Sequence, residues 1–72
     1  MVKLYQQLDL QSYRELQNYL KQHASHLSHY VIMTLIQTRN GLRIKIENTG
    51  HGNEDHINQY FTIIDDFVNE LT

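Results

Sequence analysis

The stretch HYVIMTLIQTRNGLRIKIENT, residues 29–49, decides the fold of this 72-residue chain. β-Branched and aromatic side chains flank Asn40-Gly41, a pair that tolerates the positive φ angles of a type I′ turn. The pattern therefore predicts a β-hairpin with strands at 29–39 and 42–49.

Side-chain alternation divides this hairpin into two faces. With Asn40-Gly41 as the loop, Leu35 would pair with Ile46, and Ile36 would pair with Lys45 on the opposite face. We expect the apolar face to be the core, joined by side chains from an N-terminal strand. The predicted core face consists of Val2, Leu4, Val31, Met33, Leu35, Ile44 and Ile46.

Downstream of the hairpin, the sequence predicts a helix that begins near residue 53. Its apolar side chains recur at steps of three and four residues, so one stripe would face the core. Asn53 can cap this helix, and the acidic Glu54 and Asp55 suit the positive end of its dipole.

Upstream of the hairpin, residues 1–24 permit two interpretations. VKLYQQL alternates like a strand, and Ser12 with Glu15 fits a capping box for a helix over 12–24, with Asp9 as a rival cap. Leucines at four-residue steps also permit one long helix. The predicted fold class is therefore α+β: a small antiparallel sheet packed on two helices in two layers, with the order βαββα or, alternatively, αββα.

Length and composition narrow the classes of protein. Residues 1–72 form one small domain, in which folding buries only about 60% of the surface of the unfolded chain, so self-association is expected. The absence of cysteine excludes disulfides, thiolate catalysis and cysteine-rich zinc sites. No apolar run suits a signal peptide or a membrane span, and we expect a cytoplasmic protein with no membrane contact.

Charge is segregated along the chain. All six Lys and Arg residues lie within positions 1–46, where only Asp9 and Glu15 carry the opposite charge. Positions 47–72 contain acidic residues but no Lys or Arg. The molecule should therefore be electrically two-sided, although the simplest interpretation is solvated helix and strand faces.

The segment HASHLSHY, residues 23–30, raises the question of a metal site. On a continuous helix His23 and His26 share a face, whereas His29 lies about 240° around from His23. Zinc generally takes three or four ligands, so we predict no metal and no other cofactor. His23 and His26 instead suit the last turn of a helix, where their rings can meet unsatisfied carbonyls.

Catalytic constellations are not evident. Ser25 or Ser28 lies beside histidines, but no third group is placed to orient a base, and NTGHGNEDH matches no phosphate-binding loop. Two helices over a small sheet should also leave little space for a pocket of about 300 Å³. We predict no catalytic residues and a non-enzymatic protein.

The sheet face away from the helices is the predicted interaction surface. Its apolar content exceeds that of an ordinary solvent surface, so we expect a protein to cover it, most simply a second copy in a homodimer. The alternative is a sheet platform for single-stranded nucleic acid, in which tyrosines stack on bases; the acidic balance of the chain makes nucleic acid the less favoured partner. The predicted interaction residues are Lys3, Tyr5, Tyr30, Ile32, Thr34, Ile36, Arg43 and Lys45.

Overall fold

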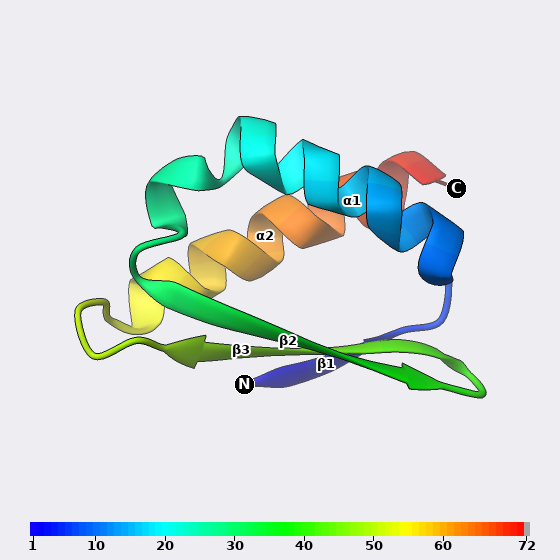
Figure 1. Cartoon of the computed structure of the whole chain (residues 1–72), viewed down its shortest axis with the longest axis horizontal. Coiled ribbons are helices and arrows are strands. Elements are labelled where there is room, and N and C mark those ends of the chain that lie inside the picture. The colour runs from blue at the N-terminus through cyan, green and yellow to red at the C-terminus, as the bar shows by residue number, and fades with distance from the viewer. Residues whose placement is uncertain (72) are drawn as a thin grey trace.

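The chain folds into two layers, a three-stranded antiparallel sheet and a pair of helices on one of its faces (Figure 1). The computed structural model describes residues 1–71. The α+β class and the order βαββα are confirmed, and the alternative of one long N-terminal helix is wrong. The elements are β1 (Val2–Tyr5), α1 (Leu10–His23), the short 3-10 helix η1 (Ser25–Leu27), β2 (Val31–Thr38), β3 (Gly41–Asn48) and α2 (Glu54–Leu71).

The sheet has the strand order β1-β3-β2, so the second strand of the hairpin is central. Leu35 pairs with Ile44, and Thr38 pairs with Gly41 at the end of the ladder. The predicted register, in which Leu35 met Ile46, is therefore wrong by two residues. Because side chains alternate with a period of two, this slip changes every cross-strand pair of the hairpin but leaves its two faces as predicted.

The hairpin turn explains the slip. Its loop residues are Arg39 and Asn40, and no residue other than glycine within 1–71 has a positive φ, so the turn is not type I′. Gly41 carries the positive φ of 129° one position later. A Cβ there would collide with the carbonyl oxygen of Tyr5 and lie 2.7 Å from the Cα of Gln6. Glycine is therefore required where β1 leaves the sheet.

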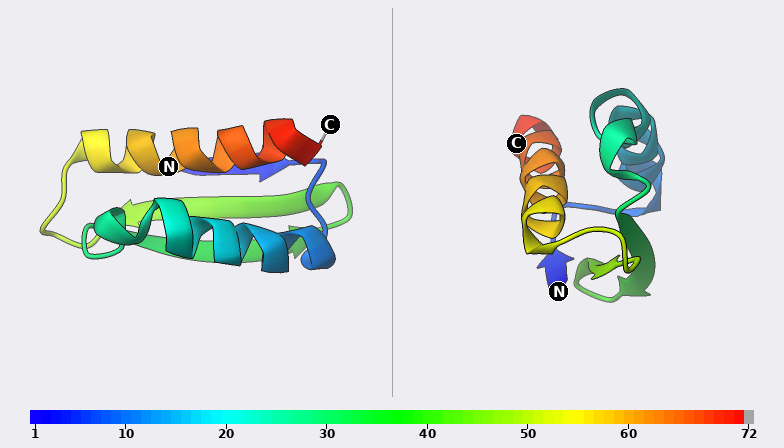
Figure 2. Two further views of the ribbon diagram at one scale, coloured as in Figure 1. Left: turned by 90° about the horizontal axis from the view of Figure 1, so that it is seen from above. Right: turned by 90° about the vertical axis from the view of Figure 1, so that its left-hand side faces the viewer.

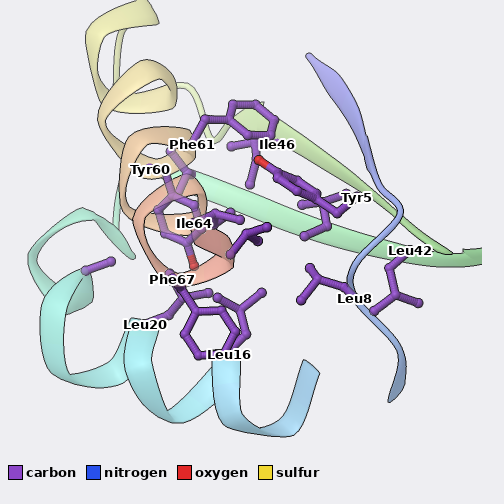
Figure 3. Close-up of a cluster of buried hydrophobic side chains, with 14 of the residues drawn as sticks. Tyr5, Leu8, Leu16, Leu20, Leu42, Ile46, Tyr60, Phe61, Ile64 and Phe67 are labelled. Carbon is purple, nitrogen blue, oxygen red and sulfur yellow. The ribbon is translucent and has the colours of Figure 1, made fainter. Parts of the chain in front are cut away.

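Both helices lie on the same side of the sheet. In the two views of Figure 2, α1 lies over β2 and α2 lies over β1, with the central β3 between them. Side chains from both helices and from the inner face of the sheet fill the space between the layers (Figure 3). Leu16 of α1, Ile44 and Ile46 of β3 and Ile64 of α2 are each 0% exposed and form the centre of this core.

The helices begin at side-chain caps. Asp9 accepts a hydrogen bond from the backbone N–H of Ser12 at 2.8 Å, so α1 begins at Leu10 and the predicted Ser12–Glu15 capping box is wrong. Asn53 caps α2 as predicted, because its side-chain oxygen accepts from the N–H of His56 at 3.3 Å. The His56 Nδ1 in turn accepts from the N–H of Asn53 at 3.0 Å, which makes the cap reciprocal.

Candidate interaction surface

The outer face of the sheet, on the side away from the helices, exposes large apolar side chains. Val2 and Leu4 of β1 are 52% and 40% exposed, and Ile32 and Ile36 of β2 are 52% and 46% exposed. Exposed apolar side chains gathered on one face of a small protein mark an interaction site more often than scattered single residues do. We define the outer face as Val2, Leu4, Ile32, Thr34, Ile36, Arg43, Lys45 and Glu47.

The N-terminal strand is turned over relative to the prediction. Tyr5 pairs with Leu42 and Lys3 pairs with Ile44, which places both on the inner side of the sheet, and Tyr5 is only 5% exposed. The predicted positions of Lys3 and Tyr5 on the outer face, and of Val2 and Leu4 in the core, are therefore wrong. Alternation in a four-residue strand defines two sets of side chains, and here both sets contain apolar surface, so the pattern alone does not say which set is inside.

Asp65 of α2 explains why Lys3 and Tyr5 turn inward. Its carboxylate accepts from the Tyr5 hydroxyl at 2.7 Å and from the Lys3 ammonium at 2.8 and 2.9 Å. Burial of the Tyr5 phenol and its hydrogen bond to Asp65 raise the Tyr5 pKa well above its ordinary value. The three side chains tie β1 to α2, and no sequence motif indicated this contact between positions 60 residues apart.

Tyr30 is also absent from the outer face. It lies just before β2, and its ring stacks on the His56 ring of α2 with centroids 4.1 Å apart and an angle of 6° between the planes. Its partly buried side chain packs against the core. The structure thus brings five of the eight predicted interaction residues together on the outer face: Ile32, Thr34, Ile36, Arg43 and Lys45.

Charge runs along the middle of the outer face. The central strand β3 contributes Arg43, Lys45 and Glu47, and the Lys45 ammonium lies 3.4 Å from the Glu47 carboxylate. The apolar side chains belong to the two flanking strands. The outer face is therefore a charged strip between two apolar strips.

The histidines are spread over several elements. His23 is the last residue of α1 and its ring lies 4.3 Å from that of Tyr19, whereas His26 belongs to η1. His29 instead stacks on His51 at 5.2 Å. Among residues 1–71, no three His, Cys, Asp or Glu side chains are grouped so that they could hold a metal ion.

A groove opens between α1 and β2. Its volume is about 300 Å³, so the expectation that this fold leaves little space for such a pocket is wrong. Of the part of the chain that the structure describes, Lys21 is the only charged residue that lines the groove. The lining residues are Gln17, Leu20, Lys21, Ala24, Ser25, Ser28, Met33 and Tyr60.

Comparison with known proteins assigns no role to these surfaces. The chain matches no protein-family model, no curated protein and no solved structure. Neither helix within residues 1–71 has the length and apolar character needed to cross a membrane.

Proposed function

We propose that this chain is a non-enzymatic protein-interaction module and that a second copy of it covers the outer face. The observation that carries the proposal is the exposure of Val2, Leu4, Ile32 and Ile36 on one face, at 40–52% each. Both helices lie on the opposite face, so residues 1–71 supply no second layer over these side chains (Figure 2). A cytoplasmic location belongs to the same proposal, since the chain contains no cysteine.

The positions of the tyrosines favour protein over nucleic acid as the partner. Sheet platforms that bind single-stranded nucleic acid stack bases on exposed aromatic rings. Tyr5 is buried and Tyr30 stacks on His56, and the residues that define the outer face include no aromatic side chain. Arg43 and Lys45 remain as phosphate contacts, but Glu47 lies beside them.

The charged strip favours a second copy as the occupant. If the two β3 strands lie antiparallel across a two-fold axis at Lys45, Arg43 of each copy faces Glu47 of the other. The Lys45 ammonium keeps Glu47 of its own chain within 3.4 Å. Arg43 and Glu47 then form an opposite-charge pair on each side of the axis, and the two Lys45 ammoniums meet at the axis with Glu47 of their own chain beside them, while the apolar strips are buried on either side.

The size of the outer face predicts a weak dimer. The molecule measures 32 × 22 × 16 Å, and its two layers stack along the 22 Å direction (Figure 1). The outer face therefore offers on the order of 500 Å² per copy, and the total of about 1,000 Å² is at the lower limit for a specific interface. We expect a dimer that dissociates on dilution through the micromolar range.

Sedimentation velocity over a concentration series tests this proposal. Wild type should change from monomer to dimer, whereas Leu4→Lys and Ile36→Glu should remain monomeric with unchanged circular dichroism, because both positions are exposed on the outer face. Gln59→Lys is a matched control, since it adds a charge at an exposed position of α2. A wild type that is monomeric at every concentration, or variants that dimerise like wild type, would contradict the proposal.

A titration with fluorescent single-stranded RNA at about 150 mM salt separates the two partner classes. We expect no affinity beyond the nonspecific range of about 10⁻⁴ to 10⁻⁶ M. Submicromolar binding that Arg43→Ala abolishes would replace the protein-interaction proposal with the nucleic-acid one.

A further inference from the structure

β2 is an edge strand whose outer backbone groups are unpaired. Within the described residues 1–71, the strand order places β3 on one side of it and no strand on the other. Edge strands usually carry a charged side chain or a proline that discourages further pairing. The eight residues of β2, VIMTLIQT, contain neither.

The hydrogen-bond pattern identifies the open positions. The N–H of Thr49 donates to the carbonyl of Tyr30 at 3.2 Å, which continues the ladder between β2 and β3 by one pair. Hydrogen-bonded pairs alternate with non-bonded pairs in an antiparallel ladder, so the even-numbered residues of β2 bond to β3. The N–H and C=O groups of Val31, Met33, Leu35 and Gln37 therefore point away from the sheet.

These open groups border the groove beneath α1. Met33 belongs to both features, since it is an odd-numbered residue of β2 and lines the groove of about 300 Å³. Leu20, Ala24 and Tyr60 supply further apolar lining. A strand added to β2 would bond to Met33 and Leu35 and would direct alternate side chains into this groove.

Helix spacing excludes a second copy at this edge. Because α1 lies over β2 in both views of Figure 2, edge-to-edge pairing of two copies would bring their α1 helices to about one strand spacing, roughly 4.8 Å. Packed helices need about 8–10 Å between their axes. The edge accordingly suits a single strand that carries no helix above it.

We propose that β2 and the adjacent groove bind an extended segment of another protein, which pairs with β2 as a fourth strand. The segment has apolar side chains at alternate positions, because the groove is lined mainly by apolar residues. It also carries acidic residues. Lys21 lines the groove, and Arg14 precedes it by seven residues and so lies on the same flank of α1.

This peptide site is distinct from the outer face. The side chains of Met33 and Leu35 point toward the helices, whereas those of Ile32 and Ile36 point away from them. Substitutions at Leu4 reach the outer face only, and a change at Lys21 reaches the groove only. The proposed dimer at the outer face and the proposed peptide site at the β2 edge can therefore be tested, and contradicted, independently of each other.

A displayed library of random 12-residue peptides, panned against the full chain, tests the proposal. The enriched peptides should alternate apolar with polar residues and be acidic, and we expect the amides of Met33 and Leu35 to become protected from hydrogen exchange when such a peptide binds. The affinity of one enriched peptide is then measured by fluorescence anisotropy against wild type and variants. Failure to enrich any alternating peptide overturns the proposal.

Gln37→Pro and Gln37→Ala form a matched pair for this measurement. Both remove the exposed Gln37 side chain, but only proline removes the outward N–H, and the ladder between β2 and β3 does not use that N–H. We expect Gln37→Pro to weaken binding about tenfold while Gln37→Ala binds like wild type. Lys21→Glu should also weaken binding of the acidic peptide, and Leu4→Lys should not. Equal binding by Gln37→Pro and Gln37→Ala, or loss of binding in Leu4→Lys, would overturn the assignment of the peptide to the β2 edge.

Discussion

Strands β2 and β3 show how position in the sheet changes what a strand exposes. β3 is central, and its side chains alternate between fully buried Ile44 and Ile46 and the charged residues of the outer face. β2 is at the edge and is apolar on both sides, with Ile32 and Ile36 half exposed. Alternation with charge is typical of a strand that faces water on one side, whereas a continuous apolar run is typical of a strand covered on both. The side chains of β3 therefore suit a strand whose outer side faces water, as in a monomer. Those of β2 suit a strand whose outer side is covered by a partner.

Replacing an inner and an outer isoleucine by lysine should give the largest difference. Ile46 is 0% exposed, and a lysine there would place an unpaired charge among apolar side chains. We expect Ile46→Lys to unfold the chain, since a buried charge costs several kcal/mol and the lost isoleucine packing adds to it, which together are comparable to the roughly 4–11 kcal/mol available to a domain of this size. Ile32→Lys should retain its secondary structure. Circular dichroism with urea denaturation distinguishes the two variants. A folded Ile46→Lys would contradict the assignment of Ile46 to the inner face of the sheet.

The next largest effect concerns the orientation of β1. Tyr5→Ala removes a buried ring and should lower the free energy of unfolding by on the order of 3 kcal/mol, whereas Leu4→Ala should change it by about 0.5 kcal/mol or less in dilute, monomeric protein. Urea denaturation at low concentration measures both values. The reverse ranking would mean that β1 presents Val2 and Leu4 to the core, as sequence alternation first indicated.

The sequence predicted the elements better than their contacts. Hairpin, helices and order follow from periodicity and turn residues, which are local, and the faces of the hairpin survived an error of two in its register. The orientation of β1 depends on Asp65, 60 positions from Tyr5 in the sequence, and no local pattern reports that contact. For the same reason Lys3, Tyr5 and Tyr30 were misplaced in the candidate site, whereas the hairpin residues Ile32, Thr34, Ile36, Arg43 and Lys45 were not.

Alkaline pH should lower the free energy of unfolding through ionisation of Tyr5. Burial and the hydrogen bond to Asp65 raise the Tyr5 pKa in the folded chain, so folding favours the protonated phenol. The contribution of the protonated Tyr5 phenol to the free energy of unfolding is fully present below the ordinary tyrosine pKa of about 10. It is lost as pH rises above that value, by at most about 1.4 kcal/mol for each pH unit. Urea denaturation between about pH 8 and 11 should show this fall.

Tyrosine variants resolve the source of the alkaline effect. Burial also raises the pKa of Tyr60, so wild type should combine two contributions of the same sign. Tyr5→Phe and Tyr60→Phe should each flatten the pH dependence. If Tyr5→Phe leaves the pH dependence unchanged, the hydrogen bond from Tyr5 to Asp65 does not form in solution.

The smallest predicted effect lies outside both faces, at the start of α1. Asp9 and Ser12 were rival caps in the sequence, and the 2.8 Å hydrogen bond from the Ser12 N–H to the Asp9 carboxylate decides for Asp9. We expect Asp9→Ala to lower the thermal midpoint and Ser12→Ala to leave it nearly unchanged, because the bond uses the Ser12 backbone.

The same bond lowers the Asp9 pKa, so folding favours the carboxylate. Its stabilisation is present above the ordinary aspartate pKa of about 3.9 and disappears as pH falls below it. Thermal unfolding at about pH 7 and pH 2 should therefore show a difference between wild type and Asp9→Ala only at the higher pH. A larger effect from Ser12→Ala than from Asp9→Ala would restore the capping box that begins the helix at residue 12.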